Sequence, residues 1–194
     1  MKKLVLIALL TIGISQTKAQ TWVTIPDTGF ITCINHYAPG AMQGNQLDIT
    51  NPLVTTIHQI IYVSSGLINL TGIQYFTSLD TLIVIHNQIT TIPALPNSLM
   101  FINCFDNQLT QLPPLPASLN KLNCGRNKLS SLPALPNTLN YLDCDNNKLT
   151  GLPALPNVLN YLDCNTNSLS SLPALDTALQ NLQCYHNILT NLPF

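Results

Sequence analysis

The stretch LPALPNTLNYLDCDNNKLTG, residues 132–151, decides the fold of this 194-residue chain. Its pattern recurs every twenty residues, without insertion, from Leu79 to the end of the sequence. Leucines, a cysteine and an asparagine return at the same place in almost every copy. A fixed period of this size is the signature of a solenoid, in which each repeat forms one turn and packs on its neighbours.

Each copy divides into a strand and a return path. The segment L-x-x-L-x-C-x-x-N alternates apolar and polar residues, as a short strand with one buried face does. Because the copies are in register, the strands should stack as a parallel sheet about 4.8 Å apart. Proline fixes φ and restricts the residue before it, so the L-P-x-L-P segment should be extended and polyproline-like rather than helical.

Two columns of identical side chains should run along the stack. A buried asparagine needs partners for its amide, and neighbouring turns offer backbone groups, so we interpret the asparagine column as structural. The cysteines should point inward as free thiols, because parallel Cβ vectors suit neither a disulfide nor tetrahedral metal binding. The ladder residues are Asn87, Asn107, Asn127, Asn147, Asn167, Asn187, Cys104, Cys124, Cys144, Cys164 and Cys184.

The N-terminal part of the chain does not follow the repeat. Residues 1–19 are predicted to be a signal peptide cleaved after Ala19, because two lysines precede an apolar run too short to span a bilayer. Residues 20–56 are assigned as an N-terminal cap over the first turn. Within this cap, Pro26 followed by Phe30 and Ile34 indicates a short amphipathic helix, and residues 37–45 should form a loop.

The repeat domain is predicted to span residues 57–194, with about seven repeats of which the last is incomplete. The sequence stops in mid-repeat, which leaves three alternatives open. Phe194 closes the last turn, the uncapped end pairs with another molecule by self-association, or the chain is part of something longer.

The repeat resembles that of leucine-rich-repeat proteins. Its twenty-residue unit is similar to the short bacterial class found in secreted effectors. The use of cysteine where other repeats carry leucine or valine resembles secreted repeat proteins of Bacteroidetes-type bacteria. The segment LINLTGIQYFTSLDTL, residues 67–82, resembles the longer internalin-type repeat. The resemblance implies a solenoid of the α/β-horseshoe class, with short parallel strands on its concave face, and a role in binding without naming a partner.

Charge narrows the range of partners. Loss of residues 1–19 removes three lysines, so seven basic residues become four against eight acidic ones, and the net charge falls from −1 to −4. An acidic, lysine-poor surface argues against nucleic acid and anionic membranes as partners. No other segment is long and apolar enough to insert into a bilayer, so we expect a secreted or cell-surface protein.

Specificity should reside in the outward side chains of the strands, on the concave face. Exposed rows of aromatic residues mark interfaces and also stack on sugar rings. Tyr141 and Tyr161 have a second interpretation as a cross-strand packing pair, which is compatible with binding. The candidate ligand-binding residues are Phe101, Phe105, Tyr141, Tyr161, Asp143, Asp163, Asn103, Asn123 and Tyr185.

Asp143, Asp145 and Asp163 gather within two turns, and such oxygen-rich clusters can hold Ca²⁺. The alternative is a solvated acidic patch, which is the interpretation we favour, and we expect neither a metal nor a cofactor. On an open face nothing should raise the pKa of one carboxyl group above that of another, so no acid–base pair and no catalytic residue is predicted.

The sequence therefore favours an exported, non-enzymatic binding module that recognises a protein or peptide through the concave face, in adhesion or interaction. The alternative is a glycan-binding surface protein, with or without assistance from Ca²⁺. An enzyme is the third hypothesis. Some effectors that carry this repeat attach it to a ubiquitin-ligase domain, but no such domain is expected here.

Overall fold

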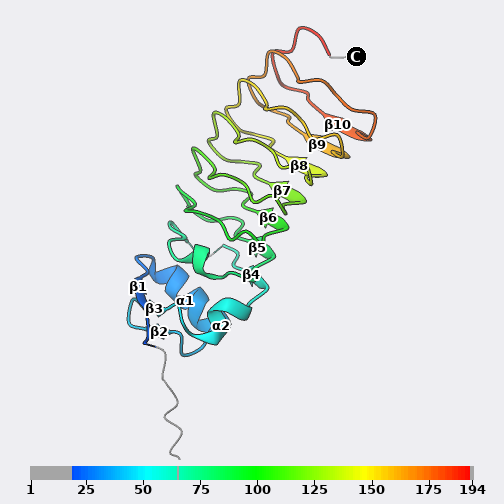
Figure 1. The fold of residues 1–194 in the computed structure, drawn as a ribbon. Helices are drawn as coiled ribbons and strands as arrows, with labels where there is room; N and C mark the ends of the chain where they lie inside the picture. The colour runs from blue at the N-terminus through cyan, green and yellow to red at the C-terminus, as the bar shows by residue number, and fades with distance from the viewer. Residues whose placement is uncertain (1–18, 65, 193–194) are drawn as a thin grey trace, which may run out of the picture.

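The computed structural model describes residues 19–64 and 66–192, and shows a stack of similar turns that rises from an N-terminal unit (Figure 1). The predicted signal peptide, apart from Ala19, lies outside the described residues, and so does Phe194. Seven short parallel strands run along one side of the stack in the order β10-β9-β8-β7-β6-β5-β4. Their bounds are β4 Gln59–Ile61, β5 Thr81–Ile83, β6 Phe101–Asn103, β7 Lys121–Asn123, β8 Tyr141–Asp143, β9 Tyr161–Asp163 and β10 Asn181–Gln183.

The repeat period sets the register of this sheet. From β5 onward each residue pairs with its equivalent twenty positions later, as Tyr141 does with Tyr161. The first pairing joins Gln59 to Thr81, twenty-two positions apart, so the longer first repeat is absorbed outside the strands. The parallel-strand solenoid predicted from the sequence is confirmed, and the proline-rich return segments contain no helix between residues 92 and 179.

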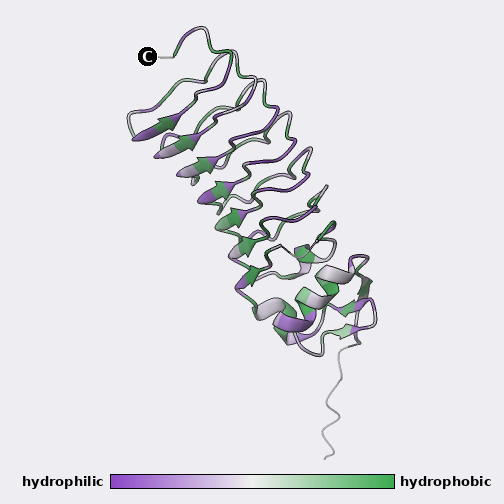
Figure 2. Cartoon of the chain, turned by 180° about the vertical axis from the view of Figure 1, so that it is seen from behind, coloured by the Kyte–Doolittle hydropathy of each residue, from purple (hydrophilic) through white to green (hydrophobic). Residues whose placement is uncertain are grey.

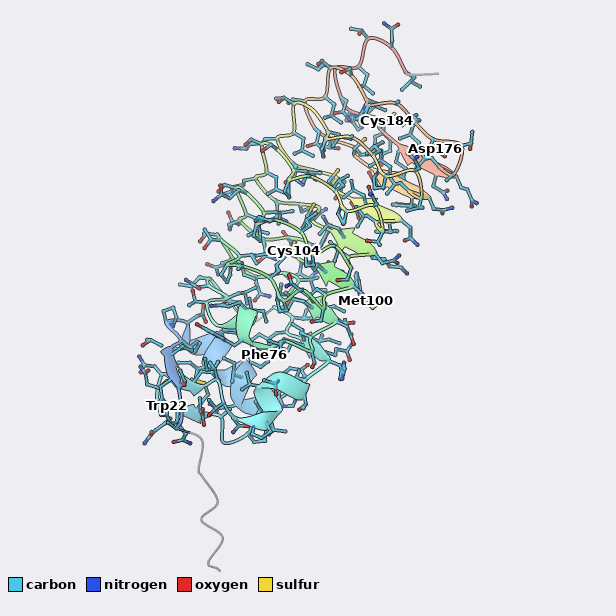
Figure 3. All side chains as sticks on the ribbon, viewed as in Figure 1. Trp22, Phe76, Met100, Cys104, Asp176 and Cys184 are labelled. Carbon is cyan, nitrogen blue, oxygen red and sulfur yellow. The ribbon has the colours of Figure 1, made fainter. Side chains whose placement is uncertain are left out.

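The core is a column of leucines and cysteines inside the turns. The middle residue of each strand from β4 to β9 is buried, and Figure 2 shows these hydrophobic strand centres lined up from turn to turn. Cys104 and Cys184 lie inside the coil in Figure 3. All six cysteines are free thiols, and burial raises the pKa of the Cys104 thiol to about 12, so this thiol stays protonated and inert.

The asparagine column joins each turn to the one before it. Asn147 Nδ2 donates to the carbonyl oxygens of Cys124 (3.1 Å), Cys144 (3.2 Å) and Asp145 (2.9 Å). Its Oδ1 accepts from the backbone N–H of Leu129 at 3.0 Å. Asn107, Asn127, Asn167 and Asn187 make the same set of contacts in their own turns.

The residue before each asparagine bends the chain toward this ladder. His86, Asp106, Arg126, Asn146, Thr166 and His186 all have left-handed backbone angles, with φ between 49° and 56°. Such angles are uncommon outside glycine and are unfavourable for a β-branched residue such as Thr166. The same bend in every turn shows that the asparagine contacts outweigh this strain.

The N-terminal unit contains the predicted helix together with strands that the sequence did not reveal. Helix α1 (Thr28–Tyr37) begins after Asp27, whose carboxylate accepts from the Phe30 N–H at 2.9 Å. Three antiparallel strands, in the order β1-β3-β2, lie beside it. These strands are two or three residues long and, unlike those of the repeat, their pattern does not recur along the chain. The loop predicted over residues 37–45 is confirmed for most of its length and is interrupted by the two-residue strand Met42–Gln43. The remaining bounds are β1 Trp22–Thr24, β2 Met42–Gln43, β3 Gln46–Asp48, α2 Pro52–Thr56 and the 3₁₀ helix η1 Ile73–Tyr75.

This unit covers the first turn in two ways. Gly72 has a φ of 109°, and a Cβ at this position would overlap the Ile25 side chain, so the cap and the first turn share one core. At the edge of the sheet, the Tyr37 hydroxyl accepts from the Ile61 N–H (2.9 Å) and donates to the Ile61 carbonyl (3.1 Å). It thereby occupies both exposed groups of a residue in edge strand β4.

We predict that Asn147→Leu lowers the free energy of unfolding by about 3 kcal/mol, because it leaves buried backbone groups of two turns unpaired. Urea denaturation measures the difference. Asn137→Leu, the same change at an exposed position on the return path, should cost less than about 0.5 kcal/mol. Equal stability of the two variants would contradict the structural interpretation of the ladder.

We also predict that Tyr37→Phe costs about 1–2 kcal/mol, because two hydrogen bonds at the sheet edge are lost while the ring is kept. The matched control is Tyr75→Phe, since the Tyr75 hydroxyl has no hydrogen-bond partner within the described ranges. Thermal unfolding of both variants tests this, and a Tyr37→Phe midpoint equal to that of the control would refute the edge-capping role.

Candidate functional site

The outward side chains of the seven strands form the open face of the sheet, which is the concave face of the sequence analysis. Each strand from β5 to β10 contributes its first and third residues to this face. Phe101, Phe105, Tyr141 and Tyr161 are half-buried against their neighbours rather than fully exposed, whereas Tyr185 is 61% exposed. The face is therefore a packed surface with few freely moving side chains.

Tyr141 and Tyr161 form the clearest feature of this face. Their rings stack with centroids 4.4 Å apart and planes within 4° of parallel. The Tyr161 hydroxyl also accepts from Gln183 Nε2 at 3.0 Å, which fixes the ring from the next strand. Burial raises the pKa of Tyr141 to about 12, so its phenol is neutral at physiological pH. The pair is a rigid aromatic platform on β8 and β9.

The other predicted aromatic residues do not join this platform. Lys121 separates Phe101 from Tyr141 along the same column of the sheet. Phe105 packs elsewhere, with the Arg126 guanidinium carbon 5.6 Å from its ring centroid. Tyr185 lies at the far end, edge-on to the His186 ring with centroids 5.2 Å apart. The structure therefore brings together two of the five predicted aromatic residues.

The polar candidates hold the chain where each strand ends. In each case the side-chain Oδ1 accepts the backbone N–H two residues later, which is an Asx-turn. The four bonds are Asn103 to Phe105 N (3.2 Å), Asn123 to Gly125 N (3.1 Å), Asp143 to Asp145 N (3.2 Å) and Asp163 to Asn165 N (3.0 Å). Sequence reasoning missed this local role, although Asn or Asp at a strand end is the usual signal for such a turn.

Their remaining atoms differ in what they offer a ligand. Asn123 Nδ2 donates to Asp143 Oδ2 at 3.0 Å, so both residues are engaged on both side-chain atoms. The Asp163 side chain makes its Asx-turn bond and no other hydrogen bond to the described residues. The other side-chain oxygen of Asp163 accepts no hydrogen bond from the described residues.

Asp143 and Asp145 do not behave as carboxyl groups on an open face. The pKa of Asp143 is raised to about 6, mainly by burial; the hydrogen bond from the Asp145 backbone N–H lowers it, and the neighbouring Asp145 and Asp163 carboxylates raise it. Burial also raises the pKa of Asp145, assisted by Asp163. The expectation that nothing distinguishes these carboxyl groups was wrong, because side chains from neighbouring strands cover part of the face.

Metal binding has no geometric support on this face. Among residues 19–64 and 66–192, no group of three or more His, Cys, Asp or Glu side chains is arranged to hold a metal ion.

The hollows between neighbouring return segments, on the opposite side of the coil, are small. One of about 170 Å³ lies between Leu155 and Leu175, below the 300–1,000 Å³ of usual small-molecule sites.

The architecture matches solved structures of bacterial proteins. YopM of Yersinia pestis, described as a leucine-rich effector protein, aligns with a TM-score of 0.59 and 33% identity over 72% of this chain and 45% of its own. A Shigella effector leucine-rich-repeat domain aligns with a TM-score of 0.66 and 27% identity, over 84% of this chain and 76% of its own. The chain is a leucine-rich-repeat solenoid.

YopM of Yersinia enterocolitica is also similar, with a TM-score of 0.57, 31% identity and coverage of 72% of this chain and 35% of its own. This leucine-rich-repeat chain thus spans less than half the length of either YopM structure. A scan of protein-family models and a search of curated proteins both find no match. Within the described ranges, none of the helices could cross a membrane.

We predict that the free energy of unfolding falls by about 1 kcal/mol between pH 4 and pH 7.5 because of Asp143, after discounting for its partial exposure. A raised pKa means that the folded state binds more protons than the unfolded one. This stabilisation is complete below the ordinary Asp pKa and is lost as the pH rises through about 6.

Urea denaturation across this pH range measures the slope, and Asp143→Asn should remove this contribution. Asp176→Asn, an exposed aspartate on the return path, should keep the parent slope and serves as the control. Identical slopes for all three proteins would show that Asp143 titrates normally.

Proposed function

We propose that this chain is an exported, non-enzymatic binding module that recognises a protein or peptide through the open face of its sheet. The stacked Tyr141–Tyr161 platform beside the Asp163 carboxylate is the observation that carries the proposal. Leucine-rich-repeat solenoids present long regular surfaces for interaction, and the similar Yersinia and Shigella proteins are described as effectors. Fold alone does not name the partner.

The platform has the properties of a binding anchor. Tyrosine offers a large apolar area with a polar tip, and residues of this kind dominate the energetics of many interfaces. The Tyr141 and Tyr161 rings are already held in place by each other and by Gln183, so binding orders little that is not ordered beforehand. An extended peptide could lay an apolar side chain on the ring edges and donate a backbone N–H to Asp163.

The remaining candidates extend this surface on either side. Phe101, Phe105, Asn103 and Asn123 lie toward the N-terminal turns, Asp143 lies beside the platform, and Tyr185 lies toward the C-terminal turns. Export rests on the signal-peptide pattern of residues 1–19, with cleavage after Ala19 and a destination in the medium or at the cell surface. The division into a cap at residues 20–56 and repeats at 57–194 belongs to the same proposal, as does self-association through the last turn.

Glycan binding is the weaker candidate on this geometry. Sugar rings stack on the faces of aromatic side chains, but Tyr141 and Tyr161 each cover one face of the other. Peptide side chains can pack against ring edges as well as faces, so the stacked arrangement favours a peptide.

We predict that Tyr141→Ala/Tyr161→Ala weakens binding of a selected peptide at least ~10-fold, because hot-spot aromatic residues contribute about 2 kcal/mol or more. Residues 20–194 would be used to select peptides from a displayed library, and calorimetry would measure the affinity. Tyr141→Phe/Tyr161→Phe keeps the stacked rings and should retain most of the affinity.

The same protein would be applied to a glycan array with and without EDTA. Glycan retention that is lost in EDTA, together with no peptide selected, would replace the peptide proposal with the glycan alternative. A double alanine variant that unfolds at the parent temperature and binds its peptide equally well would remove the platform from the binding site.

A further inference from the structure

Two carboxyl groups of the open face converge over the backbone of Gly125. A Cβ built on Gly125 would overlap Asp145 Oδ1 and would lie 3.2 Å from Asp143 Oδ1. The Phe105 ring lies on the other side of the same point, at 3.1 Å. The absence of a side chain at residue 125 is therefore what lets Asp145 fold inward against its neighbour Asp143.

This arrangement leaves one oxygen without a donor. Asp145 Oδ1 is buried from solvent and is the buried side-chain oxygen or nitrogen that lacks a hydrogen-bond partner among the described residues. The Asp143 carboxylate accepts hydrogen bonds from Asp145 N and from Asn123 Nδ2. Because a carboxylate carries no hydrogen, Asp143 cannot donate to Asp145 Oδ1 unless it is protonated. A buried unpaired acceptor facing a second acceptor is costly, and one proton between the two oxygens removes that cost.

We propose that Asp143 and Asp145 hold one proton between them in mildly acidic solution, which makes the charge of the open face respond to pH. The second part rests on the proposed function, because a change of surface charge matters only if this face binds a partner. Paired carboxyl groups that share a proton occur where two like charges are held too close for both to ionise.

The groups around the pair act in both directions. From β9, the Asp163 carboxylate raises the pKa of both Asp143 and Asp145. From the turn after β7, the Arg126 guanidinium lowers the pKa of Asp145. Because burial is the largest influence on each of the two groups, the pair as a whole keeps its proton to a higher pH than isolated aspartates do.

The sequence confines this pair to one turn. The pair needs Asp at the third position of the strand (Asp143), a second Asp two residues later (Asp145), and Gly twenty residues before that second Asp (Gly125). The next turn has Asn165 in place of Asp145, and its amide donates to Gln183 Oε1 at 3.2 Å. That amide therefore bonds to the following turn and not to Asp163, so the next turn has no counterpart of the Asp143–Asp145 pair.

The test is a titration of the aspartate carboxyl carbons by ¹³C NMR from pH 3 to pH 9, on residues 20–194. The parent should show one carboxyl group with a midpoint near 6. Asp145→Asn supplies a permanent amide donor and removes one charge, so the Asp143 midpoint should fall by about one unit or more. Parent carboxyl groups that all titrate near pH 4 would overturn the proposal.

The Gly125→Ala variant tests the position of the Asp145 carboxyl group without changing the number of charges. The added methyl group displaces the Asp145 carboxyl group while both carboxyl groups remain, so the Asp143 midpoint should again fall. Asp176→Asn makes the same chemical change at an exposed site and should leave the midpoint unchanged. If Asp145→Asn and Gly125→Ala both leave the Asp143 midpoint near 6, burial alone explains it and no proton is shared.

The NMR titration needs no partner, so its failure leaves the proposed function intact. Conversely, loss of the platform from the binding site would leave the shared proton intact. The coupling between the two is measured as peptide affinity at pH 5 and pH 8. The parent affinity should change across this interval and the Asp145→Asn affinity should change less; equal changes would overturn the switch.

Discussion

The asparagine ladder is the interaction on which the rest of the structure depends. Each amide links carbonyls of its own turn to a carbonyl of the preceding turn, so it fixes both the closure of a turn and the spacing between turns. This closure requires the residue before each asparagine to adopt a strained left-handed backbone conformation. Because the ladder repeats without interruption, the strands align in register, and the outward side chains become columns on a common face.

A ladder of this kind needs a defined first turn. Here the N-terminal unit supplies it, with a helix and a small antiparallel sheet packed against the coil and the Tyr37 hydroxyl bonded to both backbone groups of Ile61. The cap therefore replaces one neighbour of β4 by a side chain rather than by another strand. This also protects the sheet from edge-to-edge pairing at that end.

On the open face, the residues proposed for recognition also hold the fold. Asn103, Asn123, Asp143 and Asp163 turn the chain as each strand ends, and this engages part of their hydrogen-bonding capacity. The proposed binding surface therefore rests on the Tyr141–Tyr161 platform and the second oxygen of Asp163. The close packing of the face also partly buries carboxyl groups that the sequence pattern alone predicts to be solvated. This burial raises the pKa values of Asp143 and Asp145.

The sequence by itself determined the solenoid, its register and its inward columns, because a strict period of twenty forces equivalent residues into equivalent environments. It did not reveal the short strands of the N-terminal unit, since their pattern, unlike that of the equally short repeat strands, does not recur along the chain. The register also placed Tyr141 beside Tyr161, as the sequence indicated. Only the tertiary structure decided that Asp145 folds inward, because residue 125, one turn away, is glycine. Such contacts depend on the side chain of an adjacent turn, which no pattern within one repeat contains.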